Sequence, residues 1–346
     1  MLMSGVFTAR KTRREPGWLD GLGRVQVTRR GIQIALGLLW TLDGLLQFQP
    51  AMLTSKFATQ VIAPAGQGQP VLVSGPVTEA ARIILLHPAA MDVGFGLVQL
   101  ALGAGILWPR TARWALPASA AWALSVWYLG EGLGGLLGND ASLLTGAPGA
   151  ALVYAILALA VHPLGAHAAD GQRPGRWVAM AWAVLWLGGA VLELLPGRNT
   201  DASIRTSLDM NASDAPGWFA IVDHRLAALV PHASVSIVVD LVALQALAGL
   251  GVFMARRARM AALILGMSLS LIYWVAGQNM GQLWSGFATD PSTAPLIVLL
   301  AVTAAGCAPW REPRGDGAGL VSGFHPSYRP NSAPRWVTRA TAGGSR

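Results

Sequence analysis

Long apolar runs separated by short polar segments dominate the pattern of the chain. Eight of these runs are apolar enough, with few or no charges, to predict helices. They lie at residues 31–48, 89–108, 114–129, 149–161, 177–195, 232–254, 260–276 and 294–309. Because a helix of about 20 apolar residues crosses the hydrocarbon core of a bilayer, the pattern predicts an all-α integral membrane protein with eight transmembrane helices.

The two halves of the chain repeat one another. The stretch Trp127–Tyr154 matches Trp274–Leu300 at an offset of 147 positions, and each stretch has a glycine-rich turn between two apolar runs. An offset of 146 pairs positions of the preceding helices: Trp40 with Trp186, Pro50 with Pro196, Gln99 with Gln245, Arg110 with Arg256 and Arg113 with Arg259. Internal repeats are a recurrent way of building membrane folds.

This duplication predicts the organisation of the chain. We expect two four-helix repeats, and an even number of helices gives both the same orientation in the bilayer, as parallel repeats. The predicted segments are a basic tail at 1–30, the first repeat at 31–165, a linker at 166–176, the second repeat at 177–310 and a polar tail at 311–346. In the long loops we expect a short helix at 76–86, with Pro76 in its first turn, and an amphipathic segment at 217–230.

Composition supports the membrane class and changes how the charge is interpreted. Hydrophobic residues make up 53% of the chain and charged residues 12%. A net charge of +8 would suggest nucleic acid in a soluble protein, but here the arginines flank apolar runs. We therefore expect the lipid bilayer, and no nucleic acid, as a partner. The single cysteine, Cys307, excludes an intramolecular disulfide and a cysteine-built metal site.

The distribution of arginine predicts the orientation. Positive charge gathers in the tails, the linker and the short turns at 109–113 and 256–259, which fall on one side of an eight-helix model. Cytoplasmic loops carry an excess of Lys and Arg, so we predict cytoplasmic termini and glycine-rich turns on the outside. Lysine is nearly absent while Arg, Ala and Gly abound, which indicates a GC-rich bacterial genome and a bacterial inner membrane.

The two glycine-rich turns carry the first group of candidate ligand-binding residues. Glu131 stands among glycines at the outer end of its helix, and Gln278 takes the matching position. The other candidates in the turns are Gly130, Gly134, Gly277, Gly281 and Asp290. Glycine allows close approach of a ligand or of backbone, and a carboxylate at the membrane boundary needs a partner. One hypothesis is a group that binds a proton or cation; the other is a solvated turn packed by its glycines.

Three carboxylates inside predicted helices form the second group. Asp43 lies in the first helix, Glu193 takes the position that matches Gln47, and Asp240 lies in the sixth helix. Ionisable residues within membrane spans commonly face the bundle interior and serve a function. The alternative is a hydrogen bond between buried side chains that holds two helices together.

Histidines suggest a third, metal-binding hypothesis. His87 and His232 end the two long outer loops, and Met91 follows His87 by four residues. Such side chains could bind haem or copper from the outside, although a histidine at the start of a helix is more often a simple cap. A quinone could stack on the tryptophans near the membrane interfaces. The sequence requires none of these cofactors, and it contains no P-loop, HExxH motif or nucleophile elbow.

Each predicted repeat resembles the DoxX/DoxD-like family of four-helix bacterial membrane proteins. The resemblance is carried by GLLWTLDGLLQF (37–48), VQLALGAGILWPRTARWALPASAAWAL (98–124) and LQALAGLGVFMARRARMAALILGMSLSL (244–271). These stretches show a glycine-interrupted first helix and a glycine-rich second helix that ends in a basic turn. The resemblance implies a role beside membrane redox enzymes, such as those that pass electrons from sulfur compounds to quinone.

Two functions therefore remain open from the sequence. The first is an accessory component of a membrane redox or cell-envelope system, with an outward-facing polar site and a membrane or periplasmic protein partner. The second is a proton- or cation-coupled transporter or channel, with carboxylates between the two repeats.

Overall fold

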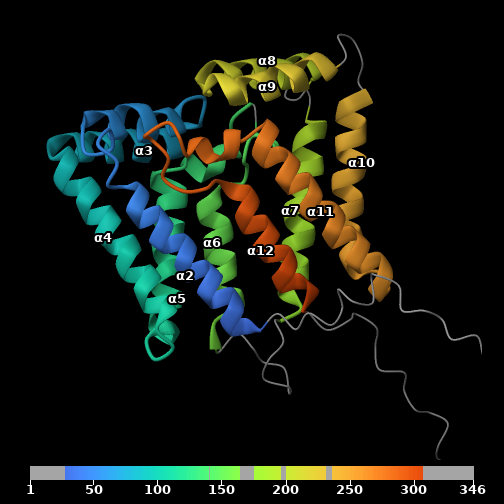
Figure 1. Cartoon of the computed structure of the whole chain (residues 1–346), viewed down its shortest axis with the longest axis horizontal. Helices are drawn as coiled ribbons and strands as arrows, with labels where there is room; N and C mark the ends of the chain where they lie inside the picture. The colour runs from blue at the N-terminus through green and yellow to red at the C-terminus, as the bar shows by residue number, and fades with distance from the viewer. Residues whose placement is uncertain (1–27, 140, 164–174, 196–199, 231–235, 307–346) are drawn as a thin grey trace, which may run out of the picture. The chain divides into compact units, whose positions relative to one another are not determined.

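The computed structural model describes residues 28–139, 141–163, 175–195, 200–230 and 236–306. Within these ranges the chain consists of helices and connecting turns, without a strand, as the apolar pattern predicts (Figure 1). The helices of the first half are α2 (Arg29–Leu46), η1 (Phe57–Ile62), η2 (Ala63–Gly66), α3 (Val71–Leu86), α4 (Pro88–Leu107), α5 (Ala112–Leu129), η3 (Gly132–Gly135) and α6 (Ala150–Ala160). Those of the second half are α7 (Trp177–Leu194), α8 (Asp201–Asp214), α9 (Gly217–Leu229), α10 (Ser236–Leu250), η5 (Gly251–Phe253), α11 (Arg256–Ala276), η6 (Asn279–Gln282) and α12 (Thr293–Ala305).

Every apolar run identified in the sequence contains a helix, and three of these helices are long and apolar enough to cross a membrane. They are α4, α7 and α11, while α6, α12 and the segment Ile237–Phe253 are apolar but shorter. The outer faces of the helices expose large apolar side chains, and Leu38, Leu97, Val184 and Ile272 are all more than half exposed. Such faces suit contact with lipid tails, which supports the membrane class.

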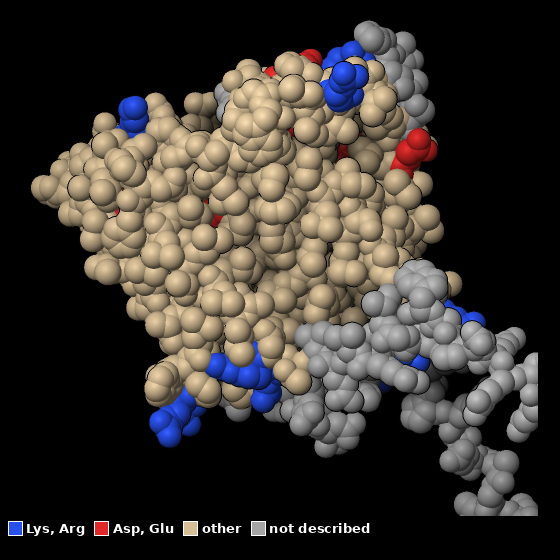
Figure 2. All heavy atoms as spheres, in the orientation of Figure 1, with Lys and Arg blue, Asp and Glu red and all other residues tan. Residues whose placement is uncertain are grey.

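Charged side chains lie mainly at the ends of the helices. Figure 2 shows one face on which a broad band without Lys, Arg, Asp or Glu separates basic groups near its two ends. At one end, Arg30 of α2 donates to the carbonyl of Ile106 over 2.9 Å, and Gln33 donates to the carbonyl of Val161 over 2.9 Å. These two side chains satisfy carbonyls that the last turns of α4 and α6 leave without a helical donor.

The helices pack in the same order in both halves of the chain. In the first half α2 packs on α4 and α5 packs on α6, and in the second half α7 packs on α10 and α11 packs on α12. The short helices α6 and α12 also contact each other, between the two sets (Figure 1).

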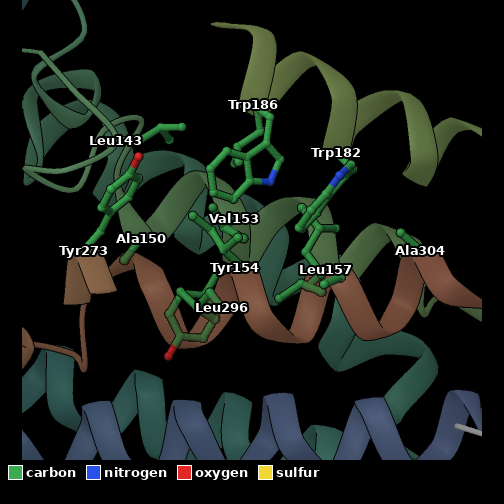
Figure 3. Close-up of a cluster of buried hydrophobic side chains, with 14 of the residues drawn as sticks. Leu143, Ala150, Val153, Tyr154, Leu157, Trp182, Trp186, Tyr273, Leu296 and Ala304 are labelled. Atoms are coloured by element: carbon green, nitrogen blue, oxygen red, sulfur yellow. The ribbon is translucent and has the colours of Figure 1, made fainter. Parts of the chain in front are cut away.

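Aromatic side chains fill the core around α6 and α12. Trp182 and Trp186 of α7 are fully buried, with ring centroids 5.5 Å apart, and Trp186 lies 6.4 Å from the ring of Tyr273. Figure 3 shows these rings beside Val153 and Leu157 of α6 and Leu296 of α12, with Leu143 reaching in from a loop. The core therefore includes side chains from both halves of the chain.

Two segments outside the apolar runs differ from their prediction. The expected helix at 76–86 begins five residues earlier, at Val71 after Pro70, so that Pro76 lies inside it rather than in its first turn. Glu79 and Arg82 share a face of this helix and form an ion pair with an Nε–Oε2 distance of 2.8 Å. The long loop at 197–231 contains α9 at the predicted amphipathic segment, and also an unpredicted helix, α8.

Tyr128 compensates for the proline inside α3. Pro76 has no N–H, so it leaves the carbonyl of Leu72 without its helical donor, and the Tyr128 hydroxyl donates to that oxygen over 2.8 Å. We expect Tyr128→Phe to cost about 1 kcal/mol, measured by thermal unfolding in detergent. In a Pro76→Ala background, where the introduced alanine would supply the N–H, the same change should cost nothing. An equal cost in both backgrounds would show that the hydroxyl has another role.

Candidate functional site

The first glycine-rich turn follows the C-terminus of α5. The amides of Gly130 and Glu131 both donate to the carbonyl of Val126, over 2.7 and 2.9 Å, which ends the helix. The chain then takes the left-handed conformation at Leu133 and Gly134, with φ of 59° and 62°. A side chain is uncommon at such a φ, so Leu133 is held there by its surroundings.

The second turn has the same backbone geometry. The amides of Gly277 and Gln278 both donate to the carbonyl of Tyr273, over 2.8 and 2.9 Å. Met280 and Gly281 follow in the left-handed conformation, with φ of 49° and 71°. The sequence match between the two turns therefore extends to their hydrogen bonds and their backbone conformation.

A tryptophan anchors each turn to the residues before the next helix. The indole N–H of Trp127 donates to the carbonyl of Pro148 over 2.7 Å. The indole N–H of Trp274 donates to the carbonyl of Pro291 over 2.8 Å. Each turn is thereby closed against the start of α6 or α12.

The polar residue of each turn caps the helix that follows. Oε1 of Glu131 accepts from the amide of Ala151 over 3.0 Å, in the first turn of α6. Oε1 of Gln278 accepts from the amide of Ala294 over 3.2 Å and from the hydroxyl of Ser292 over 2.9 Å. The first amides of a helix have no helical acceptor, and the helix dipole favours negative charge at this end. Glu131 therefore has a structural role, whatever else it binds.

The loops that follow the two turns reach across to the other half of the chain. Gln278 donates to the carbonyl of Leu143 over 3.2 Å, and Thr293 donates to the carbonyl of Gly146 over 2.7 Å. In the other direction, Gln49 at the end of α2 donates to the carbonyl of Ala288 over 3.0 Å. The crossing loops hold the two turns next to each other.

Between the turns and α8 lies a cavity of about 500 Å³. Six of the predicted site residues line it, namely Glu131, Gly134, Gly277, Gln278, Gly281 and Asp290. Hydroxyl and amide side chains complete much of the wall, including Ser207 and Asn211 of α8. The described residues that line the cavity include two carboxylates and no Lys, Arg or His.

Burial raises the pKa values of both carboxylates of the cavity. The pKa of Glu131 rises to about 8, first because of desolvation and then because of the nearby charge of Asp290, while the amides of Ala151 and Ala150 oppose the shift. The pKa of Asp290 also rises through desolvation, against hydrogen bonds from Thr289 and from the amide of Ser292. Both pKa values are thus raised, and hydrogen bonds to Asp290 oppose its shift.

Asp43 lies behind this cavity and does not line it. Its side chain is 2% exposed, and it lies beside the hydroxyl of Tyr154 and close enough to Asp290 and Glu131 to interact with both electrostatically. The ring of Tyr154 packs on Trp40, with centroids 4.5 Å apart. The structure therefore brings Asp43 near the carboxylates of the turns.

The remaining predicted residues lie elsewhere. Glu193 is buried in a separate polar cluster, where its Oε1 accepts from Ser142 over 2.5 Å and lies 3.5 Å from Nε2 of Gln245. Gln245 also donates to the hydroxyl of Tyr273 over 3.1 Å. Asp240 is exposed on α10, and Gly130 ends α5 without lining the cavity.

The structure tests little of the metal hypothesis. His87 is exposed between α3 and α4, and its ring makes no capping hydrogen bond to α4. Met91 packs against an apolar cluster that includes Met52 and Phe57. His232 lies outside the described residues. Within the described part of the chain, no group of three or more His, Cys, Asp or Glu side chains has a metal-binding arrangement.

Three polar residues of interest had no place in the prediction. Asn211 of α8 lines the cavity and donates to the carbonyl of Gly277 over 3.1 Å. Asp92 of α4 and Asp223 of α9 are fully buried, and neither carboxylate has a hydrogen-bond partner. The rule that selected Asp43, an acidic residue within an apolar run, would also have selected Asp92.

Fold and site together define an all-helical protein with membrane-compatible helices and a carboxylate-lined cavity between two matching turns. Comparisons of the chain with models of known families, with curated proteins and with solved structures give no match. The function therefore has to be argued from the cavity itself.

Proposed function

We propose that this chain is a multi-pass protein of the bacterial inner membrane that binds a small organic cation at its outer side. In this proposal eight helices cross the bilayer as two parallel four-helix repeats, with both termini in the cytoplasm. The matching backbone of the two turns and the matching helix pairs support the duplication. The arginine-rich turns at 109–113 and 256–259 support the orientation, because positive charge favours the cytoplasmic side.

The observation that carries the proposal is the pair of carboxylates in one cavity. Glu131 and Asp290 come from different turns, and both line the same space with no basic side chain among the described residues beside them. Both are partly buried, and the charge of Asp290 opposes the ionisation of Glu131, so the cavity without a ligand is unfavourable for negative charge. A bound cation would remove that penalty, because an opposite charge favours the ionised form.

The size and lining of the cavity favour an organic ammonium ion over a bare metal ion. A volume of about 500 Å³ lies in the range of sites for small molecules, about 300–1,000 Å³. The two carboxylates can accept charge-assisted N–H hydrogen bonds. Hydroxyl and amide groups such as Ser207, Asn211 and Gln282 can bind the polar remainder of the molecule.

Capture of a cation on the outer side is a first step of transport, so the cavity favours the transporter hypothesis. An accessory role in a membrane redox or cell-envelope system, with a protein partner, rests on the resemblance to the DoxX/DoxD-like family. That role remains a prediction from the sequence. Carboxylate chemistry alone does not provide the electron transfer that such a role would include.

Titration of the purified protein with protonated amines tests the proposal. With ethylamine and ethanolamine as probes in isothermal titration calorimetry, we expect Glu131→Gln and Asp290→Asn each to weaken binding about 10- to 100-fold. This is the effect of losing one charged hydrogen bond of about 1.5–3 kcal/mol.

Asp240→Asn is the matched control for this experiment. It removes one carboxylate from an exposed position of α10 that does not line the cavity, so its affinity should equal that of the wild type. Equal affinities for the wild type and both cavity variants would contradict the proposal. So would binding of sodium ions in preference to either amine.

A further inference from the structure

The two oxygens of Glu131 have different surroundings. Oε1 accepts a hydrogen bond from the amide of Ala151 over 3.0 Å. Oε2 is buried without any hydrogen-bond partner and lies against Gly149, where a Cβ atom would be only 2.2 Å from it. A buried, ionised carboxylate needs hydrogen-bond donors at both of its oxygens, and here only Oε1 has one.

Asp290 is different in this respect. Its Oδ2 accepts from the hydroxyl of Thr289 over 2.8 Å, and its Oδ1 accepts from the amide of Ser292 over 2.7 Å. Hydrogen bonds donated to both oxygens favour the carboxylate form. Of the two acidic groups of the cavity, Asp290 is therefore built to hold the charge and Glu131 is built to hold a proton.

Among the described residues that line the cavity, no cationic side chain lies beside Glu131 to favour its ionised form. The nearest titratable groups to Glu131 are Asp290 in the loop before α12, Asp43 of α2 and Tyr154 of α6. The two carboxylates disfavour a negative charge on Glu131, and the hydroxyl of Tyr154 is neutral. The residues of α8 that line the cavity are Ser207, Met210 and Asn211, none of which titrates. In the matching turn the same position is Gln278, which is a neutral side chain in nearly the same geometry.

We propose that Glu131 carries a proton on Oε2 while the cavity is empty, and that a bound organic cation displaces this proton. The O–H bond of the acid breaks, its electron pair stays on Oε2, and the proton passes to water in the cavity. The carboxylate then forms an ion pair with the cation. The net charge of the occupied cavity equals that of the empty one, so one cation is exchanged for one proton. This inference rests on the proposed function and assigns its coupling ion.

A pKa near 8 for Glu131 agrees with this geometry. At pH 7 the acid form then predominates, so binding should release close to one proton. Asp290→Asn removes a charge that helps to raise the pKa of Glu131, so this variant should release less than the wild type, with weaker binding. Glu131→Gln should bind more weakly and release no proton.

Calorimetry in two buffers measures the release directly. Ethylamine is titrated into the detergent-purified protein at pH 7, in phosphate and in Tris, whose ionisation enthalpies differ. The change in observed heat between the buffers gives the number of protons released per ethylamine bound. Close to one proton for the wild type and for Asp240→Asn, and none for Glu131→Gln, is the expected result.

A second measurement needs no ligand. Infrared difference spectra of the ligand-free wild type between pH 6 and pH 10 should show a carboxylic-acid C=O band that disappears at high pH. Other acids with raised pKa values, such as Asp223, contribute to this band, so it should be weaker in Glu131→Gln by the share of one acid. Ethylamine binding without proton release, or a band of equal size in the wild type and in Glu131→Gln, would overturn the inference and leave the proposed function standing. Failure of both amines to bind would instead overturn the proposed function.

Discussion

Gly134→Ala should destabilise the protein by more than about 4 kcal/mol or prevent it from accumulating in the membrane. A Cβ atom at this position would lie 1.9 Å from the carbonyl oxygen of Pro148 and 2.1 Å from its carbon, which are backbone atoms that cannot rotate away. The φ of 62° adds strain of about 1–2 kcal/mol for any L-residue. Thermal unfolding in detergent and the yield of folded protein measure the effect.

Gly135→Ala is the control that separates strain from collision. Its φ is 73°, but a Cβ there would meet nothing within 4 Å, so the change should cost only the backbone strain. Gly281→Ala in the second turn should fall between the two, because its Cβ would lie 2.8 Å from the carbon of Pro291. If Gly134→Ala and Gly135→Ala cost the same, the close packing of the turn against Pro148 would not be what requires glycine.

Most of the helices could be predicted from the sequence because their signal is local. An apolar run without charges stays helical whatever packs against it, and each of the eight runs contains an α-helix. The helix α8 was missed because its residues are mostly polar, and its burial comes from only a few positions such as Ile204 and Leu208. Its start did carry a signal, because Thr200 and Ser203 form a reciprocal cap.

The candidate site was only partly predictable, for a physical reason. The glycines, Glu131 and Gln278 stand out because the turn occurs twice in the sequence. Their meeting in one cavity depends on loops that cross between the halves of the chain, through contacts such as Thr293 to Gly146. Contacts between residues so far apart in the chain leave no local pattern. For the same reason the sequence did not predict Asn211 as part of the cavity wall. It also did not show that Glu193 lies in a polar cluster separate from Asp43.

The two turns differ in one respect that has consequences for stability. Their backbones match, yet the first carries an acid and the second an amide at the capping position. A neutral Gln278 satisfies its surroundings at any pH, whereas Glu131 does so best while it is protonated. The stability of the protein should therefore depend on pH through the capping residue of the first turn and not through that of the second.

Stability should fall as the pH rises from about 5 to about 8, and Glu131→Gln should remove this part of the dependence. The pKa of Glu131 is about 8 in the folded protein, against an ordinary value of 4.5 that we take for the unfolded chain. Between these values the folded state binds a proton that the unfolded state lacks. The contribution is fully present below about pH 4.5, declines by about 1.4 kcal/mol per pH unit above it, and is lost above about pH 8.

The measurement is the difference in thermal midpoint between the wild type and Glu131→Gln in detergent, at intervals from about pH 4.5 to pH 9. Because the variant keeps an oxygen that can accept from Ala151, the cap of α6 is retained and the difference reports the titration. Raised groups away from the cavity, such as Asp223, titrate in both proteins and cancel. As the pH rises, the thermal midpoint of the wild type should fall steadily relative to that of Glu131→Gln. At pH 9 the midpoint of the wild type should be the lower of the two. A constant difference across this range would mean that Glu131 is ionised in the folded protein throughout, and it would remove the basis for proton exchange in the cavity.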